Sequence, residues 1–314
     1  MNRWGDRRNP FFFAVDFNAE KGYFIPAADL DQEYIRFDFR GSNELQSLQD
    51  DFYWRAHPVS SEVYKEKFDY VQQQLHQGNS FLVNLTQPTS IETNLSLEQL
   101  YGMSTARYKL WLRDQFVVLS PESFVQITDG HISTFPMKGT IDASLPDAEE
   151  RILSDEKEQA EHATIVDLLR NDLSIVASEV EVKRYRYVEC ISTLQRDLLQ
   201  VSSEITGRLP EDYFSHLGEI LFQLLPAGSI SGAPKPKTLE IIRKAEGYER
   251  GFYTGVCGYF DGSRLDSAVM IRFIEQTEGG LVYKSGGGIT YRSVMEDEYS
   301  ELIQKIYVPL DRKH

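Results

Sequence analysis

The sequence contains only two cysteines, Cys190 and Cys257, in 314 residues. Two cysteines make neither a disulfide framework nor a cysteine-rich metal site. No run of about 18 apolar residues occurs, which excludes a membrane-spanning helix. The first ten residues are polar, and the apolar run at 11–15 is too short for the core of a signal peptide. We therefore expect a cytoplasmic protein.

Basic residues are also scarce, with 33 Lys and Arg against 48 Asp and Glu and a net charge of −15. This balance argues against nucleic-acid binding, which usually requires a basic patch. A small anion can still bind in a local basic site. Internal repeats and low-complexity linkers are absent, and the length suits one large domain or two ordinary ones. We predict a single domain over residues 1–314.

One lysine, Lys138, stands in a stretch of small and apolar residues. The alternating pattern over 124–133, with Asp-Gly in its middle, predicts a β-hairpin just upstream. Pro136 has no N–H to donate, so it ends strand pairing, and Gly139 permits unusual backbone angles. Lys138 is expected on a bend at the end of a strand. It is either a solvated surface lysine or, in a drier site, a nucleophile.

The longest helical pattern covers residues 147–173. Two glutamates, Glu158 and Glu161, fall on the same stripe as the apolar residues of this helix at steps of three and four. Buried carboxylates need a metal or another cation. The alternative is that this end of the helix projects past the core and leaves both glutamates in solvent.

Glycine-rich segments lie near isolated charges in the second half of the chain. Residues 224–235 form a small-residue turn before a predicted helix at 236–245, and helix N-termini bind anions. Arg272 ends an apolar strand predicted over 266–272, where its guanidinium suits a carboxylate. The three glycines of 286–288 are expected to form an anion-binding nest. A helix over 295–306 follows, with the acidic pair Glu298 and Glu301.

These segments resemble the chorismate-utilising enzymes. Phe-Pro-Met-Lys-Gly-Thr, residues 135–140, resembles the Pro-Ile-Lys-Gly-Thr segment of aminodeoxychorismate synthase component I, in which the lysine is taken to attack chorismate. The related anthranilate synthase component I has alanine there. Residues 161–173 resemble the Glu-His…Val-Asp-Leu-x-Arg-Asn-Asp signature of both enzymes. Residues 226–235 and 285–301 resemble their Pro-Gly-Gly-Ser-x-Thr-Gly-Ala-Pro-Lys and Gly-Gly-Gly-Ile…Glu-Tyr-x-Glu motifs.

The resemblance covers residues 78–308 and leaves 1–77 as a shortened N-terminal region. It implies an α+β fold in which large antiparallel β-sheets pack as a sandwich with flanking helices. It also implies one Mg²⁺ ion, since carboxylate oxygens suit this metal. The implied metal ligands are Glu158, Glu161, Glu298 and Glu301.

The resemblance also assigns roles in catalysis and substrate binding. Lys138 would be the nucleophile. Glu122, in a Ser-Pro-Glu triplet typical of the family, stands at the opposite end of the predicted hairpin, where it either pairs with Lys138 or is a carboxylate at the strand edge in water. The implied substrate-binding residues are Thr140, Gln200, Ser229, Gly232, Tyr253, Arg272, Gly286, Gly287 and Gly288. Gln200 stands where many anthranilate synthases have histidine. Glutamine cannot act as an acid near neutral pH, so proton delivery would pass to Glu122 or Lys138.

The implied reaction converts chorismate and ammonia to 4-amino-4-deoxychorismate, with ammonia from a separate glutamine amidotransferase subunit. Gly-Val-Cys-Gly at 255–258 does not supply that glutaminase, because a nucleophile elbow needs a strand-to-helix turn and this segment is expected to continue as a strand from Gly251. Leu82 stands where isochorismate synthases carry the lysine that activates water. The alternatives are anthranilate synthase component I and a non-catalytic chorismate-binding homologue.

Overall fold

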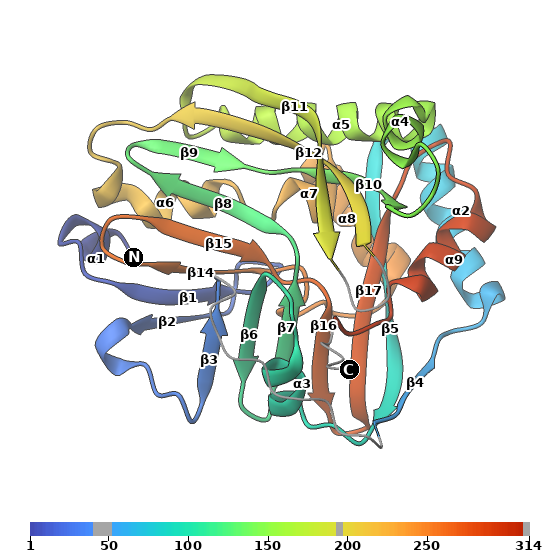
Figure 1. Cartoon of the computed structure of the whole chain (residues 1–314), viewed down its shortest axis with the longest axis horizontal. Helices are drawn as coiled ribbons and strands as arrows, with labels where there is room; N and C mark the ends of the chain where they lie inside the picture. Colours follow the sequence, from blue (N-terminus) through green and yellow to red (C-terminus); the bar gives the residue numbers. More distant parts are fainter. Residues whose placement is uncertain (40–51, 193–196, 310–314) are drawn as a thin grey trace. The chain divides into compact units, whose positions relative to one another are not determined.

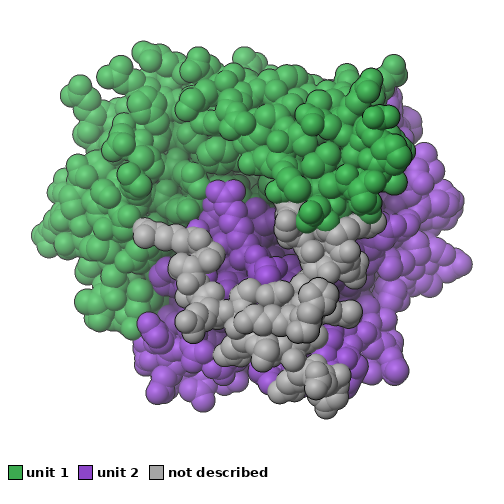
Figure 2. All heavy atoms as spheres, in the orientation of Figure 1, with its two compact units in different colours: residues 1–30, 122–229, 255–269 green, residues 31–121, 230–254, 270–314 purple. Residues whose placement is uncertain are grey.

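The computed structural model describes residues 1–39, 52–192 and 197–309, so residues 40–51 of the predicted N-terminal region lie outside it. The described chain forms two compact units, coloured separately in Figure 2. Each unit is assembled from three stretches of sequence. Unit 1 contains residues 1–30, 122–229 and 255–269, and unit 2 contains residues 31–121, 230–254 and 270–314. The single-domain organisation stays a prediction.

Unit 1 is built on one antiparallel sheet of nine strands among the described residues. Its order is β10-β12-β9-β8-β15-β14-β1-β2, and β11 pairs with β12 (Figure 1). Phe11, Phe12 and Phe13 of β1 are almost fully buried and belong to its core. The strands are β1 (Phe11–Val15), β2 (Gly22–Pro26), β8 (Ser123–Thr128), β9 (His131–Thr134), β10 (Met137–Asp142), β11 (Ser178–Ser192), β12 (Asp197–Arg208), β14 (Val256–Phe260) and β15 (Leu265–Val269).

Helix α5 is the longest helix of unit 1, and it packs on β10, β11 and β12. The apolar or neutral side chains that α5 buries are those of His162, Val166 and Leu173. The helices of this unit are α1 (Asn2–Asp6), η1 (Ala27–Asp29), α4 (Ala148–Ser154), α5 (Glu156–Leu173), η2 (Tyr213–His216) and α6 (Leu217–Gln223). The short helix α7 (Gly228–Ser231) contains the boundary between the units.

Unit 2 is built on a second antiparallel sheet, with eight strands among the described residues. Its order is β13-β5-β17-β16-β7-β6-β3, and β4 pairs with β5. The strands are β3 (Ile35–Asp38), β4 (Trp54–His57), β5 (Leu82–Thr93), β6 (Tyr108–Leu112), β7 (Phe116–Ser120), β13 (Gly232–Ala233), β16 (Phe273–Thr277) and β17 (Gly280–Ile289). The helices are α2 (Ser61–His76), α3 (Leu97–Met103), α8 (Lys235–Glu246) and α9 (Met295–Gln304).

Local sequence explains several of these elements. Asp129 and Gly130, with φ of 50° and 76°, form the two-residue turn that joins β8 and β9, since a type I′ turn needs positive φ at both central positions. Gly247, with φ of 69°, ends α8 in the left-handed conformation. The predicted hairpin and the predicted helix at 236–245 are therefore confirmed.

Three predicted boundaries are wrong. The helix expected over 147–173 is two helices, because Asp155 takes an extended conformation and its side chain accepts the N–H of Glu158 as the cap of α5. The strand expected from Gly251 begins only at Val256. The strand expected to carry Arg272 ends at Val269, and Arg272 has a φ of 50°, which β-structure does not allow.

Two large antiparallel sheets with helices confirm the predicted α+β class. Cys257 is buried and is the second residue of β14, a regular strand with no turn at the cysteine, which agrees with the absence of a nucleophile elbow. Over the described ranges, no helix is both long and apolar enough to span a membrane.

Candidate active site

Lys138 lies on an irregularity of β10 in unit 1. Met137 pairs with Ser202 of β12 and Thr140 pairs with Gln200, and the register shifts between these two pairs. A shift of this kind is a β-bulge, which re-aims side chains. Gly139, with φ of 92°, supplies the backbone angle that the bulge needs. The bend predicted around Lys138 is therefore present, but it lies inside a strand.

The bulge places Lys138 against α5. Its Nζ lies 2.7 Å from Oε2 of Glu161, and the two side chains are 30% and 12% exposed. Lys157 lies farther from the same carboxylate, at 3.9 Å. A Cβ on Gly139 would lie 3.2 Å from Oε2 of Glu158, so this second glutamate packs beside the bulge. Both glutamates are partly buried, which excludes the solvent-exposed alternative.

His162 fixes α5 to the sheet, and sequence reasoning missed this role. Its side chain is fully buried, and Nε2 lies 2.7 Å from Oγ of Ser203 on β12. That hydroxyl also accepts the backbone N–H of Arg186 at 2.9 Å. Burial lowers the pKa of His162 to about 4, and the nearby Arg186 contributes to this lowering. A neutral histidine therefore holds the helix that carries Glu158 and Glu161.

Glu122 directly precedes β8 and accepts a 2.5 Å hydrogen bond from Oγ of Ser229. Both residues line a cavity of about 20 Å³, whose wall also includes Thr134 and Asp172. This volume is about that of one water molecule. This hydrogen bond joins the Ser-Pro-Glu triplet to the small-residue turn, although Glu122 and Ser229 are 107 residues apart in the sequence. A pairing of Glu122 with Lys138 stays a prediction.

Gln200 lies on β12 opposite Thr140 of β10 and Glu189 of β11. Gln200 is partly buried and Thr140 is exposed. Both residues therefore neighbour the bulge of Lys138 through strand pairing. Their predicted contact with a substrate stays a prediction.

The second acidic pair lies in unit 2, on α9. Glu298 is buried, and Glu301 lies 2.6 Å from Nζ of Lys305, which also donates to the carbonyl of Gly286 at 3.0 Å. A Cβ on Gly287 would lie 3.6 Å from Glu298 and 3.9 Å from Glu301, so the missing side chain leaves room beside both carboxylates. The negative charge of this pair acts on a neighbouring tyrosine. Burial raises the pKa of Tyr64, and Glu298 and Glu301 raise it further.

The predicted glycine nest is wrong. Gly286, Gly287 and Gly288 lie in β17 and pair with Thr86, Leu85 and Asn84 of β5. None of the three has positive φ, whereas a nest alternates right- and left-handed angles. The lack of side chains lets β17 lie close to β5, because a Cβ on Gly286 would lie 2.6 Å from the carbonyl oxygen of Leu85.

Arg272 and Tyr253 lie together in unit 2. The Arg272 guanidinium lies 5.0 Å from the ring centre of Tyr307, and Tyr283, Tyr307 and Tyr253 are close enough to raise its pKa. Within the described ranges, no ion pair joins Arg272 to a carboxylate. Burial raises the pKa of Tyr253 and of Tyr283, so both phenols stay protonated. This cation among phenols fits the predicted contact with an anion.

Gly232 makes the closest backbone approach of the predicted binding residues. It pairs with Val83 of β5 in the short strand β13, with φ of 125°. A Cβ at this position would lie 1.9 Å from the carbonyl oxygen of Leu82. Only glycine fits, so this part of the turn is fixed by a steric requirement.

The two acidic pairs have the chemistry of a magnesium site but belong to different units. All four donors are carboxylates, as Mg²⁺ prefers, and Lys138 and Lys305 already neutralise one member of each pair. Across the described residues, no group of three or more metal-ligating side chains occurs. The set of four ligands stays a prediction.

Known proteins share both sequence and fold with this chain. The family profile described as "chorismate binding enzyme" matches residues 26–311. An uncharacterized PabA-like protein of Haemophilus influenzae is 51% identical over 312 residues, which cover 99% of this chain and 95% of that protein.

Two further relatives are larger proteins. Aminodeoxychorismate synthase component 1 of Salmonella typhimurium is 35% identical over 268 residues, which cover 81% of this chain and 58% of that protein. The crystal structure of anthranilate synthase component I from Streptococcus pneumoniae aligns with a TM-score of 0.66 and 28% identity, covering 84% of this chain and 60% of that one. With the profile match over most of its length, the chain belongs to the chorismate-binding enzyme family.

Proposed function

We propose that this protein is an aminodeoxychorismate synthase component I, which converts chorismate and ammonia to 4-amino-4-deoxychorismate. The observation that carries the proposal is Lys138, presented by the bulge of β10 and paired with Glu161. Anthranilate synthases resemble this chain elsewhere but have alanine at this position. A lysine held there supplies a nitrogen nucleophile that alanine cannot supply.

Lys138 would act as a covalent nucleophile. Its neutral amine forms a bond to C2 of chorismate while the ring double bonds shift and the C4–O bond breaks. The departing hydroxyl takes a proton and leaves as water. Ammonia then adds at C4, the double bonds shift back and the C2–N bond to Lys138 breaks. Lys138 leaves as the neutral amine, and the ammonium group formed at C4 releases a proton that restores the acid which protonated the hydroxyl, so the enzyme returns to its starting state.

Glu122 is the proposed proton donor to the departing hydroxyl. Gln200, on the strand next to the bulge, can hydrogen-bond but cannot donate a proton as an acid. Glu122 has the 2.5 Å hydrogen bond from Ser229, which fixes the orientation of its carboxyl group. A general acid must lie within hydrogen-bond reach of the group that it protonates, and a fixed carboxyl group can hold that position.

Substrate binding would use both anionic ends of chorismate. Magnesium, held by the glutamates of α5 and α9, would neutralise the ring carboxylate when bound. Arg272, among its three tyrosines, would bind the other carboxylate. Ammonia would come from a separate glutamine amidotransferase subunit, since Cys257 is buried in a strand and cannot serve as a glutaminase nucleophile.

The proposal is tested by product analysis. The purified chain is incubated with chorismate, MgCl₂ and an ammonium salt at mildly alkaline pH, and the products are identified by mass spectrometry. We expect 4-amino-4-deoxychorismate, and none when EDTA replaces the metal. Formation of anthranilate and pyruvate would instead support an anthranilate synthase. Binding of chorismate without any turnover would support a non-catalytic homologue.

A further inference from the structure

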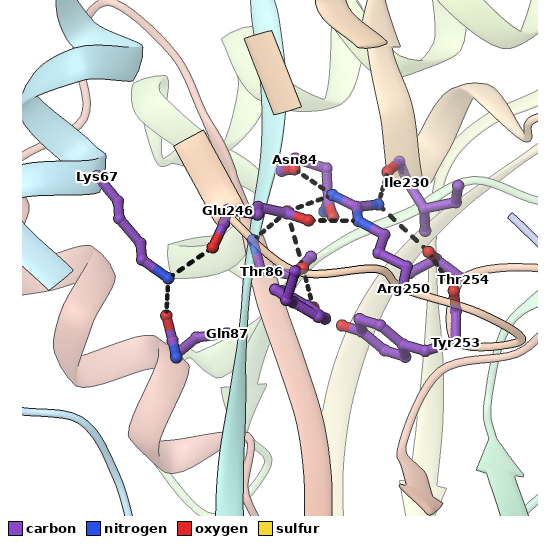
Figure 3. A network of polar contacts seen from close by, with 10 residues as sticks. Lys67, Asn84, Thr86, Gln87, Ile230, Glu246, Arg250, Tyr253 and Thr254 are labelled. Atoms are coloured by element: carbon purple, nitrogen blue, oxygen red, sulfur yellow. Dashed lines mark hydrogen bonds and ion pairs between the residues drawn. The ribbon is translucent and has the colours of Figure 1, made fainter. Parts of the chain in front are cut away.

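A buried ion pair in unit 2 lies among the segments that carry the predicted substrate-binding residues. It joins Glu246, the last residue of α8, to Arg250, and the shortest distance between the two side chains is 2.6 Å. Both side chains are 1% exposed. Figure 3 shows Arg250 pointing into a network that contains Asn84, Ile230 and Thr254. None of these residues carries a role in the proposed reaction.

The Arg250 guanidinium uses all five of its N–H donors within the protein. Nε and Nη2 donate to the two oxygens of Glu246 at 2.9 and 2.6 Å. Nη1 donates to the carbonyl of Ile230 at 2.9 Å and to Thr254 at 3.2 Å, and Nη2 also donates to the carbonyl of Asn84 at 2.7 Å. Because no donor is left over, this arginine cannot bind an anionic substrate.

The three groups that Arg250 binds belong to three different segments of the predicted site. Ile230 lies two residues before Gly232 in the small-residue turn. Thr254 follows Tyr253, and its backbone N–H donates to Met270, two residues before Arg272. Asn84 lies on β5 opposite Gly288 of β17. One guanidinium group therefore fixes the distances between all three segments.

The partner carboxylate strengthens the same connection. Oε1 of Glu246 accepts the backbone N–H and the hydroxyl of Thr86, both at 2.8 Å, and Thr86 pairs with Gly286 of β17. Lys284, on the same strand, donates to the carbonyl of Arg250 at 3.0 Å. A fully hydrogen-bonded buried pair is rigid, and removing one member leaves a buried charge.

We propose that Arg250, together with Glu246, is a positioning residue that fixes the turn of Gly232, the loop of Tyr253 and the glycine strand of residues 286–288 as one binding surface. This inference rests on the proposed function for the identity of the ligand, chorismate. The geometry is specific to arginine, because the ammonium group of lysine has three donors in place of a planar fork of five.

The chain offers a matched control in the same unit. Lys109 and Asp38 form a second buried pair at 3.8 Å, with side chains 3% and 2% exposed. They lie on β6 and β3, at the opposite end of the strand order from β13, β5 and β17. A change at Lys109 disturbs a buried charge without touching the three binding segments.

The test compares Arg250→Lys with Lys109→Gln. For Arg250→Lys we expect faster amide hydrogen exchange in residues 230–233, 251–254 and 284–289, and a KM for chorismate raised about tenfold or more with a smaller change in kcat, since each lost internal hydrogen bond to a charged group disfavours the ordered arrangement of the binding segments by roughly a factor of ten. For Lys109→Gln we expect faster exchange confined to β3, β6 and their neighbours, with KM unchanged.

Two results would overturn the inference. One is Arg250→Lys with normal exchange in the three segments. The other is an Arg250→Lys variant that loses as much thermal stability as Lys109→Gln but has an unchanged KM, which would make Arg250 a purely structural residue. If Arg250→Lys does not fold, the neutral pair Glu246→Gln with Arg250→Gln replaces it, with the same expectations. Absence of chorismate turnover by the wild-type protein would refute the proposed function alone, and the exchange data would still decide the role of Arg250.

Discussion

The ammonium group of Lys138 lies 2.7 Å from the carboxylate of Glu161, so the proposed nucleophile is paired with a proposed metal ligand. In this pair the lysine is a cation, whereas attack on carbon needs a neutral amine. The lysine must therefore give up a proton before the reaction. A metal ion at Glu161 would compete with Lys138 for the same carboxylate, which links metal binding to the release of the nucleophile.

Lys138→Met should therefore bind Mg²⁺ more tightly than the wild-type protein, by several-fold, because a competing positive charge is removed. Titration calorimetry in the absence of chorismate measures this without any turnover. Lys157→Met is the control, because Lys157 lies 3.9 Å from Glu161 and is about half exposed, so its removal should change the affinity less. Equal or weaker Mg²⁺ binding by Lys138→Met would show that lysine and metal do not share Glu161.

Glu161→Gln and Glu301→Gln should each abolish Mg²⁺-dependent turnover while leaving the fold intact. A neutral amide oxygen is a much weaker ligand for a hard dication than a carboxylate. Glu156→Gln and Glu296→Gln are matched controls, because both residues are exposed and lie five residues before Glu161 and Glu301 on the same helices. Full activity in both Glu161→Gln and Glu301→Gln, with normal circular dichroism, would remove these residues from the metal site.

The purified chain should use ammonium salts but not glutamine as its nitrogen source. The thiol of Cys257 is buried in β14, and burial raises its pKa well above the ordinary value, so it is an inert thiol. Amination is measured with 15N-ammonium and with amide-15N glutamine in parallel. Incorporation of the glutamine label by the chain alone would contradict the need for a partner.

Gly232→Ala should destabilise unit 2 by about 3 kcal/mol or more, because its Cβ would lie 1.9 Å from a backbone oxygen that cannot move aside. Gly247→Ala separates this clash from simple backbone strain. Gly247 also has positive φ, but a Cβ added there would have no neighbouring atom within 4 Å, so alanine should cost only about 1 kcal/mol. Urea unfolding measures both, and equal losses would show that the close approach at Gly232 is tolerated.

The sequence predicts the elements that depend on local chemistry. The Asp-Gly turn before Lys138 and the helix after Pro234 are read correctly, because turn and cap preferences act over a few residues. The broken helix at Asp155 is missed because an aspartate cap inside a continuous helical pattern looks the same as a surface residue. The position of Arg272 outside its strand depends on a positive φ that no local residue type signals.

The site is predicted only where its residues form a motif. Lys138, Glu158 and Glu161 are found by pattern and lie together. The buried polar contacts that hold the helices and segments of the site are not found, because their partners come from distant parts of the sequence. Ser203 lies 41 residues from His162, and Asn84 lies 166 residues from Arg250. A buried histidine or arginine has no period or spacing that distinguishes it from a surface one. Only the fold reveals which polar side chains are enclosed.

Lys138 is the covalent nucleophile of the proposed reaction. Lys138→Ala should lose most of the aminodeoxychorismate activity, by about a hundredfold or more, if loss of the nucleophile is at least as severe as loss of a general acid or base. Intact-protein mass spectrometry of the wild-type protein with chorismate and Mg²⁺, but without ammonia, should show a covalent adduct that peptide mapping assigns to Lys138. Lys157→Ala should form the adduct normally, because that lysine contacts the same glutamate from a neighbouring turn of α5 without lying on the bulge. An alanine variant that makes the product at the wild-type rate would show that Lys138 only binds substrate, since a covalent step cannot proceed without its nitrogen.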